Sequence, residues 1–143
     1  MENGARRLRR GRISGVIHGA HILLYSTDAE ADRNFFRDVL GFPHVDAGGG
    51  WLIFALPPAE VAVHPDEPGE HGGHAGHRML GAHLYLMCDD LKATMRALKA
   101  KNAACAEIST ECWGIRTTVK LPSGGEVGLY QPTHQTAIGL KNR

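Results

Sequence analysis

The sequence predicts an α+β fold of two tandem βαβββ modules, whose curled mixed sheets surround a cup-shaped cavity. Three observations support this prediction: an internal repeat, an alternation of strand-like and helix-like segments, and glycine or proline at segment boundaries. The repeat is the strongest, because residues 21–25 (HILLY) and 83–87 (HLYLM) are offset by 62 positions, which also aligns Asp28 with Asp90. Such internal repetition indicates two copies of one supersecondary unit.

Module one begins with an apolar segment that leads into an amphipathic helix. Residues 17–26 are rich in strand formers, and they are followed by Asp28, a good helix N-cap. Within residues 29–40 the apolar side chains recur every three or four positions, and Gly41 occupies the place of a left-handed C-cap. We therefore expect a strand followed by a helix of about three turns.

The remainder of module one contains strong turn signals. Three consecutive glycines, residues 48–50, predict a turn before the apolar stretch 51–56. Pro57 and Pro58 end that stretch, and residues 60–64 form another strand-like run. These segments predict antiparallel strands joined by short turns.

Module two repeats the same order of elements. Residues 82–87 are strand-like, Asp90 is a plausible N-cap, and Leu91, Met95 and Leu98 lie on one face of a second helix. The predicted organisation is therefore a flexible basic leader (1–15), a single domain (16–134) and a tail (135–143). Within the domain we expect module one at about 16–64, a linker at about 65–78 and module two at about 79–134.

Composition narrows the class of partner. The formal net charge is +1, and the charged fraction of 22% and hydrophobic fraction of 43% are those of an ordinary soluble protein. The sequence lacks a long apolar span, a phosphate-binding glycine loop and a basic patch interleaved with aromatic residues, so we expect neither membrane nor nucleic-acid partners. The 3 cysteines lack metal-type spacing, which favours a reducing, cytoplasmic location.

Three segments resemble the vicinal oxygen chelate superfamily of glyoxalases, extradiol dioxygenases and antibiotic-resistance proteins. Residues 21–28 (HILLYSTD) and 35–42 (FFRDVLGF) look like the opening strand and helix of its members, and residues 121–132 (LPSGGEVGLYQP) look like their final hairpin. The resemblance extends from about residue 17 to residue 132. It implies a small-molecule ligand, a homodimer, and in many members a divalent metal such as iron, manganese, nickel or zinc.

The resemblance also implies positions for metal ligands. Side chains alternate along a strand, so His21 and His83 face the cup if their apolar neighbours pack against the helices. These histidines match the two positions that supply ligands in metal-binding members. The usual third ligand is a glutamate, whereas this chain has Gly128 there and Ala62 at the related position of module one.

Other side chains are predicted to line the cavity or to act in it. Glu126 and Tyr130, on the last predicted strand, are the candidate acid-base groups. Flat apolar surfaces with one cation suit a small, partly aromatic or anionic ligand. The candidate ligand-binding residues are Tyr25, Trp51, Phe54, Tyr85, Trp113 and Arg116. For each of these, core packing or pairing with a nearby carboxylate is the alternative interpretation.

Two functions fit these observations. The first is a metal-dependent lyase or dioxygenase that acts on a small oxygenated metabolite, with His21 and His83 as partial metal ligands. The second is a metal-free protein that binds and sequesters an aromatic natural product of the antibiotic type. The absence of a carboxylate at Gly128 favours the second function, and the resemblance to metal-binding members favours the first.

Overall fold

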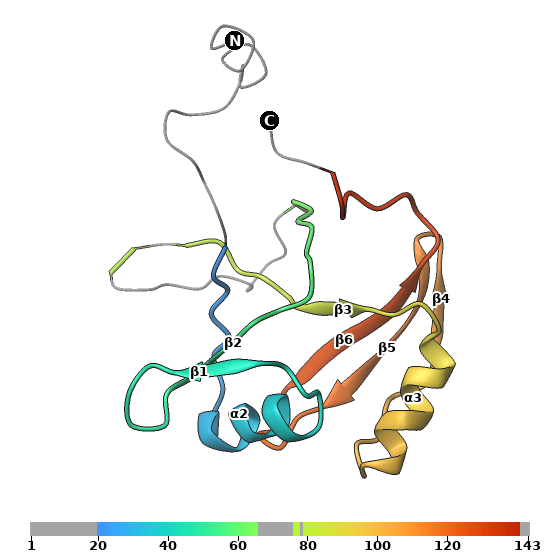
Figure 1. Ribbon diagram of the computed structural model, residues 1–143. Helices are drawn as coiled ribbons and strands as arrows, with labels where there is room; N and C mark the ends of the chain where they lie inside the picture. The colour runs from blue at the N-terminus through green and yellow to red at the C-terminus, as the bar shows by residue number, and fades with distance from the viewer. Residues whose placement is uncertain (1–19, 66–75, 78, 141–143) are drawn as a thin grey trace, which may run out of the picture.

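The computed structural model describes residues 20–65, 76–77 and 79–140 (Figure 1). The predicted leader and nearly all of the predicted linker therefore lie outside the described residues. The helices are α2 (Ala29–Asp38) and α3 (Leu91–Ala100). The strands are β1 (His44–Asp46), β2 (Leu52–Phe54), β3 (Tyr85–Met87), β4 (Ser109–Glu111), β5 (Gly114–Lys120) and β6 (Glu126–Pro132). The α+β class is confirmed, and the two sheets remain open rather than closing on each other.

Module two forms a four-stranded sheet with the order β3-β6-β5-β4. β3 runs parallel to β6, while β6 pairs with β5 and β5 with β4 in the antiparallel sense. α3 connects β3 to β4 and covers one face of this sheet (Figure 1). The predicted βαβββ order is therefore complete in module two.

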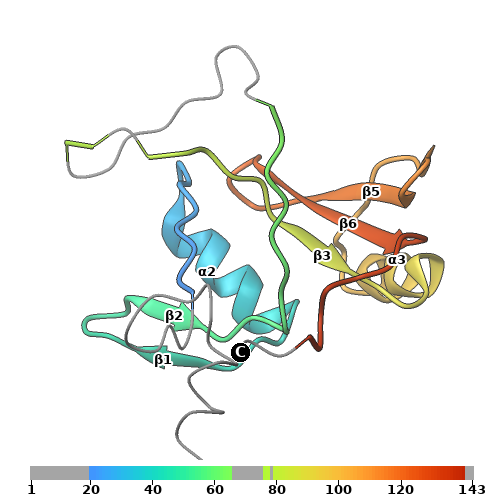
Figure 2. The ribbon, with the colours of Figure 1, turned by 90° about the horizontal axis from the view of Figure 1, so that it is seen from above.

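Module one contains a smaller sheet than expected. β1 and β2 pair as an antiparallel hairpin, and α2 lies between this hairpin and the four-stranded sheet (Figure 2). The predicted strands at 17–26 and 60–64 were wrong for their described parts, which have no strand structure. A strand forms only where a neighbour takes up its backbone hydrogen bonds, and the ladder of the β1–β2 hairpin includes neither segment. Their side chains are consequently exposed, as in Tyr25 (74%) and Val61 (89%).

Both helices begin and pack as the sequence predicts. The carboxylate Oδ1 of Asp28 accepts a hydrogen bond from the amide of Ala31 at 3.2 Å, and Asp90 accepts one from Ala93 at 3.1 Å. Gly41 follows the first helix with φ of 73°, a conformation that costs glycine little. No helix in the described ranges is long and apolar enough to cross a membrane.

One hydrophobic core joins the two modules. Leu91 of α3 and Val119 of β5 are fully buried, and burying such a side chain contributes about 1.5–3 kcal/mol. Phe35 and Phe36 of α2 belong to the same cluster, so the module-one helix completes the core of module two. The other members of the cluster are Leu98, Ala103, Leu121, Val127 and Leu129.

A buried carboxylate also holds the modules together. Asp32 of α2 accepts hydrogen bonds from the backbone amide and hydroxyl of Ser123, at 3.0 and 2.7 Å, in the turn between β5 and β6. It accepts a third from the hydroxyl of Ser26 at 2.7 Å. Hydrogen bonds to a charged group contribute about 1.5–3 kcal/mol each, so this contact fixes α2 on module two.

Candidate functional site

Three aromatic side chains of module two meet on the side of the sheet away from α3. Tyr85 comes from β3, Tyr130 from β6, and Trp113 from the turn between β4 and β5. Their ring centroids are 5.2–6.1 Å apart, and the ring planes cross at 81–89°. These edge-to-face contacts stabilise the group beyond simple burial. We call Tyr85, Trp113 and Tyr130 the aromatic face.

The strand register places these rings on one side of the sheet. Tyr85 lies opposite Gly128, and Met87 lies opposite Tyr130. Directly paired residues share a face, whereas Leu86 and Leu129 point to the other side and pack in or against the core. The predicted alternation along residues 83–87 is therefore confirmed for Tyr85 and Leu86.

Two glycines make room for the aromatic face. A Cβ atom on Gly128 would overlap the ring of Tyr85, so this ring lies directly over the Gly128 backbone. Gly114 has φ of 148°, and a Cβ there would overlap the carbonyl of Gln131 on β6. The backbone of Trp113 is held in place, since its carbonyl accepts a hydrogen bond from the Thr133 amide at 3.0 Å.

Tyr130 also contacts a polar group that the sequence did not suggest. Its hydroxyl is 3.2 Å from Nε2 of His134, and the two rings are stacked. The Glu60 carboxylate lies 3.9 Å from the same Nε2 atom and accepts a hydrogen bond from the Ala137 amide at 2.6 Å. Burial, and then the charge of Glu60, raise the pKa of Tyr130 above its usual value of 10.0. The phenol therefore stays protonated at neutral pH.

The sequence contains one signal that could have found His134. It follows Tyr130 by four residues, which is an even spacing, and it lies two residues beyond the end of β6. Glu60 gives no such signal, because it reaches this place through the path of residues 56–65 and not through a strand.

The polar residues of the sheet pair with one another. Nε of Arg116 is 2.9 Å from Oε2 of Glu111, which also accepts a hydrogen bond from the Ser109 hydroxyl. These two hydrogen bonds, that from Ser109 first, lower the pKa of Glu111. Arg116 lies opposite Tyr130 in the ladder, so the predicted cation borders the aromatic face but is already engaged by a carboxylate.

The two candidate acid-base groups are not brought together. Glu126 and Tyr130 are four residues apart on β6, which separates them by about 13 Å along the strand. The Glu126 carboxylate accepts a hydrogen bond from the Thr118 hydroxyl at 2.6 Å. A joint catalytic role for these two residues has no support from this geometry.

The module-one candidates do not join the aromatic face. Trp51 lies at the turn between β1 and β2, where the Arg33 guanidinium is 5.2 Å from its ring centroid. Phe54 packs on Phe36 at 5.5 Å and thus belongs to the core side of its hairpin. Tyr25 is exposed in the segment that forms no strand. These three residues thus lie apart from the aromatic face in this structure, and their role in ligand binding stays a prediction.

The described residues do not fit a three-ligand metal site. The place of the usual third ligand is Gly128, and the Tyr85 ring fills the space that a side chain there would need. Within the described ranges, no three histidine, cysteine or acidic residues are grouped so that they could hold a metal ion. His21 is exposed in the same strandless segment as Tyr25. Metal binding by His21 and His83 stays a prediction.

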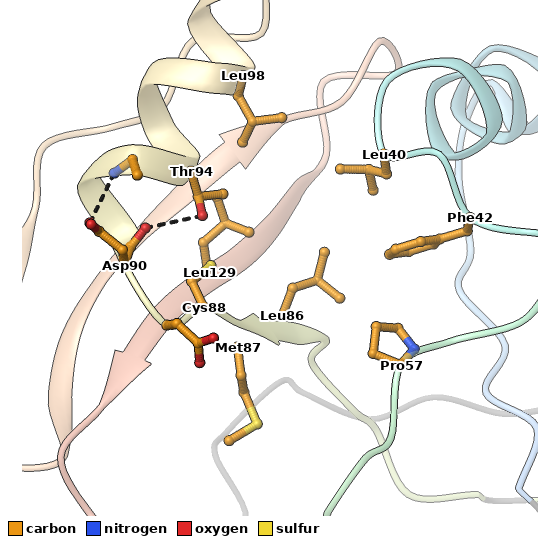
Figure 3. Close-up of a pocket in the computed structure, with 12 residues that line it drawn as sticks. Leu40, Phe42, Pro57, Leu86, Met87, Cys88, Asp90, Thr94, Leu98 and Leu129 are labelled. Carbon is orange, nitrogen blue, oxygen red and sulfur yellow. Dashed lines mark hydrogen bonds between the residues drawn. The ribbon is translucent and has the colours of Figure 1, made fainter.

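A separate cavity lies between the modules, on the helix side of β3 (Figure 3). It has a volume of about 490 Å³, and its walls include Leu40, Phe42, Pro57 and Leu86. None of the predicted site residues lines it. Cys88 is at its edge, and burial, with the nearby Asp89 carboxylate, raises the pKa of its thiol. The thiol therefore stays protonated, and a protonated thiol is a poor nucleophile.

Comparisons with known proteins agree with this fold. Residues 19–129 match the family model described as "Glyoxalase/Bleomycin resistance protein/Dioxygenase superfamily". TnmS3, an antibiotic binding protein from Streptomyces sp. CB03234, is similar in structure, with a TM-score of 0.51 and 19% identity over 85% of this chain and 100% of TnmS3.

A lactoylglutathione lyase from Agrobacterium tumefaciens is also similar. Its TM-score is 0.53, with 19% identity over 84% of this chain and 95% of the lyase. No functionally curated protein matches the sequence significantly. At these identities the structural likeness shows a shared fold.

Proposed function

This chain belongs to the glyoxalase/bleomycin resistance protein/dioxygenase superfamily, and we propose that it binds a small planar aromatic molecule on its aromatic face without needing a metal ion. One observation carries the proposal: the rings of Tyr85, Trp113 and Tyr130 meet, and that of Tyr85 lies over Gly128, the position where the resemblance implies a metal-binding glutamate. Aromatic surface thus replaces the third ligand.

The geometry of the rings suits a flat ligand. Trp113 is partly exposed, Tyr85 is 37% exposed, and Tyr130 lies deeper at 9%. Because these rings are nearly perpendicular, they form a corner in which a ligand ring can stack on one and meet the edge of another. A protein of this fold that is described as antibiotic binding supports small-molecule binding as the use of such a surface.

We infer that the binding protein is a homodimer. Apolar residues of module one are exposed in the single chain, and grouped exposure of this kind marks an interaction surface. The segment 21–25 repeats the sequence pattern of residues 83–87, and among the described strands β3 lies at the end of its sheet. A second copy can therefore supply strand partners for these segments. The residues to be covered are Ile22, Leu23, Leu24, Val61 and Val63.

Calorimetric titration of the untagged protein with 2-methoxynaphthalene tests the binding proposal. We expect Trp113→Ala to weaken binding at least tenfold, because the largest stacking surface of the aromatic face is lost. Trp51→Ala is the matched control: it removes the other tryptophan of the chain, which lies under Arg33, and should change affinity less than twofold. Equal loss in both variants, or no binding by the wild type, would refute the proposed site.

Elemental analysis of the same preparation tests the competing metal-dependent function. About one divalent metal per chain, lost in the double variant His21→Ala/His83→Ala, would favour the metal-dependent enzyme function. Metal-free protein that still binds the naphthalene probe would favour the binding function.

A further inference from the structure

The hydrogen bonds around His134 determine which way protons point at the edge of the aromatic face. Nδ1 of His134 is 2.9 Å from the backbone carbonyl of Gln135, and Nε2 is 3.2 Å from the Tyr130 hydroxyl. A carbonyl oxygen only accepts hydrogen bonds, so Nδ1 must carry the proton of the neutral imidazole. Nε2 is then an acceptor, and the Tyr130 hydroxyl donates to it.

This arrangement leaves the Tyr130 oxygen as an acceptor. Its one hydrogen is directed to His134, whereas its lone pairs remain for another donor. Successive hydrogen bonds polarise one another, so the Tyr130 oxygen accepts more strongly than an isolated phenol does. The raised pKa of Tyr130 keeps its hydrogen in place across the neutral range.

The charged groups next to this pair are already partly engaged. Glu60 is 3.9 Å from Nε2 of His134, and its other oxygen accepts from the Ala137 amide. Arg116, opposite Tyr130 on β5, is held by Glu111. Glu60 is thus the described carboxylate placed to pair with His134 when the imidazole becomes charged.

We propose that Tyr130 and His134 form a hydrogen-bond relay that recognises the hydroxyl group of a phenolic ligand. This inference rests on the proposed function and names its ligand class: a hydroxyarene, whose ring meets Tyr85 and Trp113 while its hydroxyl donates to the Tyr130 oxygen. Tyr130 and His134 come from β6 and the segment just after it, so the relay and the aromatic face have a fixed relative position.

The relay reverses when His134 is protonated. The Nε2 atom then carries a hydrogen and donates to the Tyr130 oxygen, so the phenol hydrogen of Tyr130 turns toward the ligand. A ligand hydroxyl that had donated to Tyr130 loses its acceptor. Recognition of the hydroxyl should therefore be lost wherever acidification has charged the imidazole.

The test compares 2-naphthol with 2-methoxynaphthalene by calorimetric titration of the full-length protein at pH 8 and pH 5. A hydrogen bond to a polarised acceptor corresponds to about tenfold in affinity, so we expect wild type to prefer 2-naphthol about tenfold at pH 8. At pH 5 the preference should fall to one or below.

Two variants identify the relay. Tyr130→Phe keeps the ring but removes the hydroxyl, so it should abolish the preference at both pH values. His134→Ala should reduce the preference at pH 8 and remove its pH dependence. Thermal unfolding of each variant confirms that it is folded before titration.

The outcomes separate this inference from the proposed function. Binding of both probes with no preference at pH 8, or a tenfold preference that survives in Tyr130→Phe, would overturn the relay and leave the aromatic site standing. If 2-methoxynaphthalene does not bind the wild type, the aromatic site itself is wrong, and the relay falls with it.

Discussion

Residues 21–25 and 83–87 have nearly the same sequence pattern, but only the second segment lies in a sheet. Tyr85, Leu86 and Met87 form β3 because β6 provides a parallel partner opposite each of them. The corresponding residues of module one have no strand structure, and the apolar ones are exposed. The difference teaches that the local pattern makes a segment competent for a strand, and the partner decides whether the strand forms.

The two helices show a second contrast at equivalent positions. Asp32 and Thr94 are related by the same offset of 62 residues that relates the two strands. Asp32 reaches into the other module, where it accepts from Ser123. The Thr94 hydroxyl instead donates to the backbone carbonyl of Asp90 in its own helix turn, at 3.1 Å. Of these two equivalent positions, residue 32 makes a contact between the modules and residue 94 makes one within its own helix.

The largest expected change in unfolding free energy comes from replacing Asp32, and Thr94 provides the matched comparison. Asp32→Ala removes a buried acceptor and leaves the Ser123 amide without its partner, so we expect a loss of about 3 kcal/mol in unfolding free energy. Thr94→Ala should cost under about 0.5 kcal/mol, because alanine favours the helix and only a local bond is lost. Urea denaturation measures both. Similar values for the two variants would show that Asp32 does not hold the modules together.

Leu24 and Leu86 occupy equivalent positions in residues 21–25 and 83–87, and replacing each of them tests the difference between these two segments. Leu86→Ala removes a side chain packed against the core and should cost about 2 kcal/mol. Its counterpart Leu24 is 46% exposed, so Leu24→Ala should cost less than about 1 kcal/mol in dilute, monomeric protein.

The same Leu24→Ala variant tests the proposed homodimer. If a second copy covers residue 24, the variant should weaken self-association measurably in sedimentation equilibrium, whereas Trp51→Ala should not. A wild-type protein that stays monomeric at high concentration would contradict the proposed homodimer.

A smaller effect is expected at Gly128 and its module-one counterpart Ala62. Gly128→Ala forces the Tyr85 ring to move and should cost about 1–2 kcal/mol, as overpacking does. Ala62→Val lies in an exposed segment and should be nearly neutral. A double-mutant cycle with Tyr85→Ala measures the coupling by denaturation. Additive effects at positions 85 and 128 would show that the ring does not lie over the glycine.

The sequence predicted the parts of the fold that depend on neighbouring residues. Asp28 and Asp90 cap their helices as expected, because N-capping is a contact over three residues. The alternation that places Tyr85 away from the core follows from strand geometry alone. The family resemblance identified the superfamily to which the chain belongs.

What escaped prediction depends on contacts distant in sequence. Gly128 indicated a missing ligand, but nothing in the sequence showed that the Tyr85 ring would fill its place. The contact between His134 and Glu60 joins residues 74 positions apart and belongs to no repeated pattern. The contact between Phe54 and Phe36 likewise joins a strand to a helix and follows from no local pattern.

Because the Tyr85 ring lies over Gly128, it also determines the order in which positions 85 and 128 can be substituted. A side chain longer than hydrogen at position 128 meets the ring, so a carboxylate cannot be gained there in one tolerated step. The ring at position 85 must be lost first, and that loss removes one wall of the aromatic face. A lineage with this pair of residues therefore gives up part of the aromatic face before it can acquire a carboxylate at position 128, which makes the exchange hard to reverse.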